Sequence, residues 1–392
     1  MRILFVGDPY CVHSSRWIHQ LRDTGWDIHL FDPTNALIHL ELEGITLHTG
    51  WKKKDVPRGT RVCSRWPFTR GRHFLQRRLP MLWSRILPPP EERLARLIEQ
   101  LSPDCVHSLG LRDYATPVVR AAEQLDGGLE VPWIFSCRGS DIFYFRRTPQ
   151  EVDAIRKVLA GCDYFLANCE RDVSLAGEYG LRGEVLGLFQ GGGGYPVDEM
   201  VAECPPGPPS ARKAVAVKGL ETVLGRALLT IEALRRCADL LQDHRILFHQ
   251  CRPETVEAAE QFSRDTGIEI EILPRVHYRK VWSYFGRARL SIAVSLSDGI
   301  PNAMLESMIM GALPIQTDPG GATAEWIEDD TNGLLVPPDD ADAVASAIRR
   351  GLQDDALVDE AAEINRRLAR ERLDYEMVRD RVIEMYHRVV DR

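Results

Sequence analysis

One stretch of the sequence constrains the fold more than any other: Ser295 to Glu325, which reads SLSDGIPNAMLESMIMGALPIQTDPGGATAE. A run typical of a buried strand leads into it at residues 290–294. A helical pattern then covers Asn302 to Gly311, and a second buried-strand pattern covers Leu313 to Ile315. Buried strands that alternate with helices are typical of a parallel sheet with helices packed on its faces. The stretch therefore predicts an α/β fold.

Polar groups in this stretch suit a phosphate-bearing ligand. We expect helix N-termini at Gly299 and at Gly320-Gly321, the second helix carrying Glu325. A helix N-terminus offers free backbone N–H groups and the positive end of the helix dipole, so it can hold a diphosphate without a metal ion. Glu306 lies within the first helix. Its ionised carboxylate only accepts hydrogen bonds, which suits a diol such as a ribose.

These residues resemble a known motif. Asp298-x7-Glu306, Gly311-x-x-Pro314 and Gly320-Gly321-x-x-x-Glu325 are similar to the E-x7-E region of retaining glycosyltransferases of family 4. In that family the first acid contacts the donor sugar. Here it is Asp298, one methylene shorter than the usual glutamate. The resemblance implies the GT-B fold, in which two Rossmann-like doubly wound domains bind a nucleotide sugar between them. The donor-binding residues that it implies are Gly299, Ile300, Pro301, Asn302, Glu306, Gly320, Gly321 and Glu325.

Both halves of the chain show the α/β pattern. A buried strand at residues 2–6 opens the first half, and the strand pattern restarts at residues 214–217 after the linker-like CPPGPP of residues 204–209. With the resemblance, this predicts an acceptor-side domain over residues 1–203 and a nucleotide-sugar-binding domain over residues 210–375. The last helix, residues 376–392, would cross back to the first domain. The chain has neither G-x-G-x-x-G after its first strand nor G-x-x-x-x-G-K, which argues against an NAD enzyme and a P-loop NTPase.

Two cations follow the strand at residues 214–217. Lys218 and Arg226 lie on a loop between a strand and a helix, where α/β sheets place their ligands. The resemblance implies that they neutralise the donor diphosphate, and Asp298 completes the predicted catalytic set by orienting the donor sugar. The alternative is that either cation lies on the surface without a function. The resemblance also implies front-face attack, in which the leaving phosphate helps to deprotonate the acceptor and no enzymic nucleophile is needed.

Residues on the acceptor side come from the first half. Arg138-Gly139-Ser140-Asp141 resembles the family's H-G-S-D segment, with Arg138 in place of the usual histidine. Arginine cannot act as a general base at neutral pH, but it can pair with a phosphate or an acidic acceptor. Alternatively, Asp141 caps the following segment and Arg138 forms a surface ion pair. His13 lies in a loop that the resemblance places at the interdomain cleft, and Gly191 to Gly194 form either a flexible linker or a mobile loop against the donor.

Residues 51–85 are rich in lysine, arginine and aromatic residues, with Asp55 as the single acid. Three interpretations remain open: a solvated loop and helix, a surface that docks on anionic lipid head groups, or a nucleic-acid surface. The net charge of −8 disfavours nucleic acid as a partner. In the lipid interpretation, the hydroxyl acceptor is lipid-linked and the protein works at the inner face of the membrane.

Composition sets further limits. The nine cysteines form no C-x-x-C pair, which favours a reducing compartment without a disulfide framework or a zinc ribbon. The apolar run at the start is too short for a signal peptide, and no run reaches the about 18 residues of a membrane span. We therefore expect a cytoplasmic protein. Asp340-x-Asp342 precedes a helix, where aspartate is usually an N-cap rather than a metal ligand. We expect no metal or cofactor, with the nucleotide sugar as a substrate.

The resulting hypothesis is a retaining hexosyltransferase that uses a UDP- or GDP-linked sugar and a hydroxyl acceptor in glycan or glycolipid assembly. One alternative is a nucleotide-sugar epimerase of the same fold, for which His13 is the main candidate for proton transfer. A second alternative is a non-catalytic protein that binds a nucleotide sugar.

Overall fold

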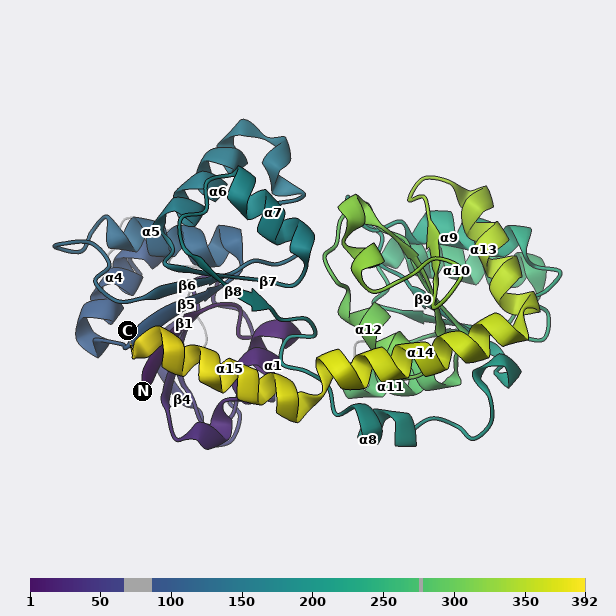
Figure 1. The fold of residues 1–392 in the computed structure, drawn as a ribbon, viewed down its shortest axis with the longest axis horizontal. Helices are drawn as coiled ribbons and strands as arrows, with labels where there is room; N and C mark the ends of the chain where they lie inside the picture. Colours follow the sequence, from purple (N-terminus) through teal and green to yellow (C-terminus); the bar gives the residue numbers. More distant parts are fainter. Residues whose placement is uncertain (67–86, 275–277, 392) are drawn as a thin grey trace. The chain divides into compact units, whose positions relative to one another are not determined.

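A computed structural model describes residues 1–66, 87–274 and 278–391 (Figure 1). Of the basic segment at residues 51–85, the part from residue 67 onward therefore lies outside the described residues. The chain divides into two compact units: residues 1–193 with 378–392, and residues 194–377. Residues 194–209, which the sequence analysis assigned to the first domain or to the linker, thus belong to the second unit.

The first unit is built on an eight-stranded sheet in which every strand pair is parallel. Its strand order is β4 (Arg61–Trp66), β3 (Thr46–Trp51), β2 (Asp27–Phe31), β1 (Arg2–Val6), β5 (Cys105–Leu109), β6 (Trp133–Ser136), β7 (Tyr164–Ala167), β8 (Glu184–Leu188). Strands β2, β3 and β4 follow one another on one side of β1, and β5 to β8 follow one another on its other side. The strand order therefore reverses between β1 and β5. The central strands are buried on both faces, which explains their continuous apolar runs.

Helices cover both faces of this sheet (Figure 1). They are α1 (Val12–His19), α4 (Pro90–Leu101), α5 (Thr116–Ala122), α6 (Pro149–Gly161), α7 (Glu170–Glu178) and the C-terminal α15 (Tyr375–Val390), with short turns η1 (Arg22–Thr24), η2 (Leu111–Ala115) and η3 (Phe145–Arg147). The predicted return of the last helix to the first domain is confirmed, since residues 378–392 belong to this unit.

A buried polar network fixes α15 in the first unit. The Tyr386 hydroxyl accepts from Trp17 Nε1 at 2.9 Å and lies 2.6 Å from His107 Nδ1, while His107 Nε2 lies 2.7 Å from Ser136 Oγ. Every group in this network has a partner when the tyrosine hydroxyl donates to Nδ1 and the histidine proton sits on Nε2. Burial lowers the pKa of His107 to about 3, so the ring is neutral.

The second unit is built on a six-stranded sheet, again parallel throughout. Its order is β11 (Ile270–Ile272), β10 (Arg245–His249), β9 (Ala214–Lys218), β12 (Leu290–Ala293), β13 (Leu313–Thr317), β14 (Leu334–Val336). The order reverses between β9 and β12. Its helices are α8 (Val197–Ala202), α9 (Ala227–Arg236), α10 (Pro253–Thr266), α11 (Tyr278–Arg287), α12 (Asn302–Ile309), α13 (Ala341–Gln353) and α14 (Asp355–Leu373), with turns η4 (Pro209–Ala211), η5 (Pro319–Gly321) and η6 (Thr323–Glu325). The predicted fold class, α/β with two doubly wound domains, is confirmed.

Two local predictions about secondary structure are wrong. Residues 61–66 form β4 at the edge of the sheet rather than a loop or helix. No α-helix opens at Gly320-Gly321, where the chain makes two short 3-10 turns, because Gly320 has a φ of +71° that a right-handed helix does not allow. By contrast, Asp340 caps α13 as predicted, its side chain accepting from the N–H groups of Asp342 and Ala343. Across the described residues, no helix combines the length and the apolar character needed to cross a membrane.

Candidate functional site

The second unit places two predicted residues together at the reversal of its strand order. Lys218 ends β9 and Asp298 follows β12, its neighbour in the sheet. Lys218 Nζ lies 3.3 Å from Asp298 Oδ2, and the two side chains are 15% and 32% exposed. Ligands of doubly wound sheets bind outside the carboxyl ends of the strands at such a reversal. The pair is therefore in the position expected for a ligand site and remains accessible from solvent.

Asp298 also engages the backbone that was expected to bind phosphate. Its Oδ1 accepts from the Gly299 N–H at 3.0 Å. The helix begins only at Asn302, with Pro301 as its N-cap, so neither a free N–H at Gly299 nor a helix start there is present. The cation–carboxylate pair, rather than a helix N-terminus at Gly299, is thus the charged feature of this loop.

The loop after β9 is fastened to the loop after β12. Arg226 N donates to the Val294 carbonyl at 3.0 Å, and Leu296 N donates to the Leu224 carbonyl at 2.7 Å. A Cβ on Gly225 would collide with the carbonyl oxygen of Leu220, so this close turn requires glycine. The two loops that carry Lys218 and Asp298 consequently form one hydrogen-bonded platform.

Arg226 does not face the Lys218–Asp298 pair in this structure. Its Nη1 donates to the carbonyl oxygens of Thr222 at 3.3 Å and Gly225 at 3.2 Å, within its own loop. The residue precedes α9 as its N-cap. Both bonds come from Nη1, and they hold the guanidinium against its own loop.

Glu306 lies on α12 and is 6% exposed. The buried Tyr195 hydroxyl donates to its Oε1 at 3.5 Å, a long bond. A carboxylate that burial has largely removed from water gains from hydrogen bonds with a bound diol, as the sequence analysis expected. Tyr195 was not predicted, because the four glycines before it indicate only a linker or a loop and assign no role to the next side chain.

The second glycine loop is held by an acid that the sequence analysis missed. Asp318 Oδ1 accepts from the N–H groups of Thr323 at 2.8 Å and Ala324 at 3.1 Å. Gly320 and Gly321 both have positive φ values, so this loop needs glycine for its conformation. Glu325 ends the second turn, and the side chain of Asp318 caps the start of that turn.

In the first unit, Arg138 joins two loops. Its Nη1 donates to Cys11 Sγ at 3.0 Å and its Nη2 to Ser14 Oγ at 2.7 Å, and it forms no surface ion pair with any described residue. Asp141 caps the turn, its Oδ2 accepting from the Arg138 N–H at 2.8 Å. Burial raises the pKa of Asp141 to about 6, against the lowering effect of that hydrogen bond. His13 is exposed on α1.

The glycine run at residues 191–194 contains the boundary between the two units and has a defined backbone conformation. All four glycines have positive φ, between 60° and 118°. A Cβ on Gly193 would lie 3.0 Å from the Arg16 carbonyl oxygen, and one on Gly192 would lie 3.4 Å from His13 Cα. Gly192 and Gly193 thus pack closely on α1.

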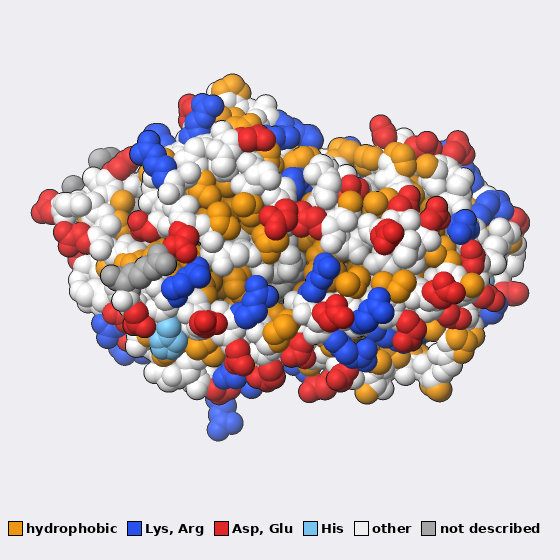
Figure 2. Space-filling view, in the orientation of Figure 1, with side chains coloured by type: hydrophobic (Ala, Val, Ile, Leu, Met, Phe, Trp, Pro, Cys, Tyr) orange, Lys and Arg blue, Asp and Glu red, His pale blue; other side chains and the backbone are white. Residues whose placement is uncertain are grey.

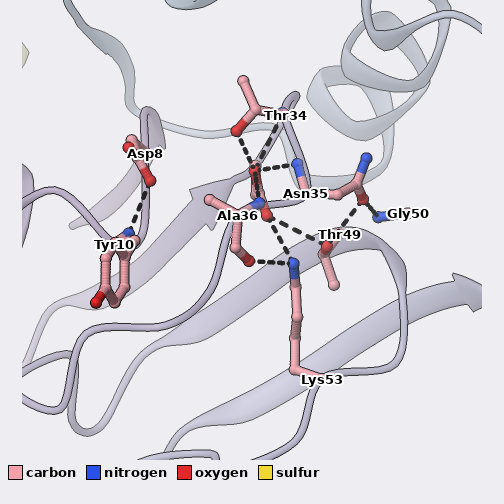
Figure 3. Close-up of polar contacts among 9 residues, drawn as sticks. Asp8, Tyr10, Thr34, Asn35, Ala36, Thr49, Gly50 and Lys53 are labelled. Carbon is pink, nitrogen blue, oxygen red and sulfur yellow. Dashed lines mark hydrogen bonds and ion pairs between the residues drawn. The ribbon is translucent and has the colours of Figure 1, made fainter. Parts of the chain in front are cut away.

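A buried acid occupies the end of β2 in the first unit. In dinucleotide-binding folds an acid near this point binds the ribose. Here Asp32 Oδ2 pairs with Lys53 Nζ at 3.1 Å, and Oδ1 accepts from the N–H groups of Thr34 at 3.1 Å and Asn35 at 2.6 Å (Figure 3). Burial raises the pKa of Asp32, and the Lys53 ammonium opposes that shift. Asp32 is thus committed to internal contacts.

The described part of the basic segment is mixed in exposure. Lys53 is buried, whereas the other cations among residues 51–66 are exposed: Lys52, Lys54, Arg58, Arg61 and Arg65. Figure 2 shows basic and acidic side chains interspersed over the visible face of each unit rather than gathered by sign.

Comparison with known proteins agrees with this architecture. Residues 228–354 match the family model described as Glycosyl transferases group 1, a range that contains Asp298, Glu306 and the second glycine loop. This part of the chain is a group 1 glycosyltransferase domain. No curated protein matches the sequence.

Solved glycosyltransferases share the fold over the whole chain. Sucrose-phosphate synthase from Thermosynechococcus elongatus is 15% identical, with a TM-score of 0.67 and coverage of 99% of both chains. Anabaena HepE in complex with UDP and glucose is 15% identical, with a TM-score of 0.68 over 98% of this chain and 99% of that one. The lipopolysaccharide outer core galactosyltransferase WaaB is 14% identical, with a TM-score of 0.66 over 98% and 99%. The chain therefore has the GT-B fold of these enzymes.

Proposed function

We propose that this protein is a retaining glycosyltransferase that moves a hexose from a UDP- or GDP-linked sugar to a hydroxyl acceptor, in glycan or glycolipid assembly. The observation that carries the proposal is the Lys218–Asp298 pair at the strand reversal of the second unit. The buried Glu306 on the following helix and the glycosyltransferase family match over residues 228–354 support it further. The UDP complex of the structurally similar HepE favours a uracil nucleotide.

Electrostatic stabilisation of the leaving group is the chemistry that these residues suit. As the bond between the sugar C1 and the diphosphate oxygen breaks, negative charge grows on the diphosphate, and Lys218 is placed to stabilise it. Arg226, on the same loop, adds a second positive charge. Asp298, freed from Lys218 by the competing diphosphate, orients donor-sugar hydroxyls, and Glu306 accepts from the ribose hydroxyls.

Retention follows in this proposal from attack on the same face that the diphosphate leaves. The acceptor oxygen forms the new bond to C1, and its proton passes to the departing phosphate oxygen. No enzymic nucleophile is required, and no metal ion is assigned a role.

The acceptor belongs to the first unit in this proposal, with His13, Arg138 and Asp141 near its strand ends. A lipid-linked acceptor would bring that unit to an anionic membrane surface. The exposed Leu37 and Leu40, 68% and 66% exposed, precede the exposed cations of residues 52–65 in the chain and supply apolar contacts for such docking. Flotation with vesicles tests this: the protein should float with anionic vesicles and not with neutral ones, and equal recovery would rule the docking out.

A binding screen followed by a product assay tests the central proposal. We expect UDP- or GDP-sugars, rather than ADP-sugars, to raise the melting temperature, and Glu306→Gln and Lys218→Ala to weaken that effect. Incubation of the stabilising donor without acceptor should give only slow hydrolysis. A changed sugar would indicate an epimerase, and binding without any turnover would indicate a sensor. Full turnover in both variants would refute the site assignment.

A further inference from the structure

Arg138 lies where three neighbouring strands of the first unit end. It follows β6, and it bonds to Cys11 after β1. A Cβ on Gly110, the residue after β5, would lie 3.7 Å from Arg138 Nε. The strand order of this sheet reverses between β1 and β5, which is where doubly wound sheets bind ligands. The guanidinium is therefore in the ligand position of the first unit.

The positive charge of Arg138 has no counter-charge in direct contact. The partners of its side chain are the Cys11 sulfur and the Ser14 hydroxyl, and no carboxylate among the described residues lies within ion-pair distance of it. The nearest acid along the chain is Asp141, and its carboxylate accepts a hydrogen bond from the backbone N–H of Arg138 rather than from the guanidinium. Burial disfavours the charge of Arg138, but Cys11 and the Asp141 carboxylate outweigh this effect and raise the pKa of the guanidinium. Asp141 acts without a bond to the guanidinium, so the side-chain N–H groups have no carboxylate as a direct partner.

Two further arginines on the same loop also lack an acidic partner among the described residues. Arg146 stacks on the Phe143 ring at 5.3 Å and Arg147 on the Tyr144 ring at 4.8 Å. A guanidinium stacked through its face keeps its N–H edge available for a bidentate bond to an oxyanion.

Neighbouring arginines differ in this respect. Arg112 is 3.3 Å from Glu151, and Arg171 is 2.8 Å from Asp172. Arg138, Arg146 and Arg147 thus lie together on the loop after β6 without an ion pair to any described residue, unlike Arg112 and Arg171.

We infer that the loop after β6 binds a phosphate ester carried by the acceptor next to the hydroxyl that receives the sugar. Arg138 is its anchor, and Arg146 and Arg147 are outer contacts. The assignment of this phosphate to the acceptor rests on the proposed function, whereas the phosphate site itself rests on the contacts above. The ester belongs either to a free glycerol or sugar phosphate or to a phospholipid head group.

Cys11 provides a direct reporter of this site, because its half-exposed thiol accepts from the Arg138 guanidinium. The experiment measures the rate at which N-ethylmaleimide labels each cysteine of the native full-length chain, by peptide mass spectrometry. Glycerol 3-phosphate should slow labelling of Cys11 about tenfold at ten times its dissociation constant. Glycerol at matched ionic strength should leave the rate unchanged. Cys63, which is also half-exposed in the first unit, should be unaffected by either compound.

Matched variants separate anion binding from a structural role. Arg138→Gln should abolish the protection of Cys11, Arg138→Lys should retain part of it, and Arg156→Gln should retain all of it. Arg156 is a suitable control because it is exposed and stacks on Tyr179, on α6 outside the loop. If Arg138→Gln does not fold, the double change Arg146→Gln and Arg147→Gln at the outer contacts should reduce the protection. Equal labelling of Cys11 with and without glycerol 3-phosphate and lipid phosphate, or full protection in Arg138→Gln, would overturn the inference.

Two additional arms identify the source of the phosphate and isolate the proposed function. Protection of Cys11 by phosphatidylglycerol vesicles but not by glycerol 3-phosphate would indicate a lipid head group, with phosphatidylcholine vesicles as the control. UDP should slow labelling of Cys251, whose thiol lies against Gly219 beside Lys218. If Cys11 is protected but Cys251 does not respond to UDP, the phosphate site is supported and the proposed donor site is contradicted. If Cys251 responds to UDP but Cys11 is not protected, the donor site is supported and the phosphate site is contradicted.

Discussion

Replacing Glu306 by glutamine tests the proposed donor site most directly, because it removes the negative charge and keeps the shape of the side chain. Glu306 is 6% exposed, so bulk water contributes little to satisfying its carboxylate. The Tyr195 hydroxyl reaches Oε1 only at 3.5 Å. Hydrogen bonds from a bound ribose diol should therefore add stabilisation that this carboxylate does not obtain from bulk water.

The size of the effect follows from the number of acceptors. A carboxylate can accept from both ribose hydroxyls, whereas the glutamine amide accepts through one oxygen and presents N–H groups in place of the other. Losing one hydrogen bond to a charged group, and weakening the second, costs about 2–3 kcal/mol. At 1.4 kcal/mol for each factor of ten, nucleotide affinity should fall roughly 30- to 140-fold.

Calorimetric titration with UDP, or with GDP if the screen selects it, measures this change. The deoxy-nucleotides lacking one ribose hydroxyl complete a cycle: their affinity loss should be large in the wild type and small in Glu306→Gln, because the acceptor for that hydroxyl is already gone. Tyr195→Phe, which keeps the carboxylate, is the control and should change affinity only a few-fold. The reasoning fails if Glu306→Gln binds the nucleotide as tightly as the wild type, or if the missing hydroxyl costs the same in both proteins.

Three other predictions concern the buried pair, the glycine run and metal ions. Lys53→Met leaves Asp32 buried without its cation and should lower the free energy of unfolding by about 3–5 kcal/mol. Burial already raises the pKa of Asp32 in the folded state, and removing Lys53 raises it further. The folded variant therefore binds more protons than the unfolded chain, and the loss of unfolding free energy should be larger at pH 8 than at pH 5. Urea titrations that give equal losses at both pH values would contradict this. Gly193→Ala should lower the melting temperature more than Gly207→Ala, because both positions have positive φ but only Gly193 lies against a carbonyl oxygen, that of Arg16; equal shifts would argue against the close contact. EDTA should leave transfer activity unchanged, and activity that is lost with EDTA and restored by a divalent cation would refute metal-independent transfer.

The sequence predicts those parts of the fold whose cause is local. Buried parallel strands need apolar side chains on both faces, so residues 2–6 and 214–217 are recognisable as central strands. The edge strand at residues 61–66 is polar and only partly buried, so nothing in its own sequence distinguishes it from a loop. Its identity depends on pairing with β3, which a single sequence does not display.

The candidate site also combines features that the local sequence predicts with contacts that depend on distant segments. The types of Asp298, Glu306 and Lys218 suggested their chemistry, but the contact of Lys218 with Asp298 joins residues 80 positions apart and required the strand order. The loop at Gly320 was misread because two glycines before an acid suggest a helix start, whereas the side chain of Asp318 fixes another turn. Lys53 was placed among surface cations, since its partner Asp32 is distant in the sequence.

The division of the chain also determines the order in which the two units can be completed during synthesis. Residues 194–377 form one uninterrupted segment whose ends meet, since Tyr195 N donates to the Leu373 carbonyl at 2.7 Å and Tyr375 N to the Tyr195 carbonyl at 3.0 Å. The first unit needs residues 378–392 as well, because the hydroxyl of Tyr386 satisfies the buried Trp17 and His107. On the ribosome, the unit that is begun first is therefore the one that is finished last. The second unit can fold as a single piece while the sheet made before it still lacks its final helix.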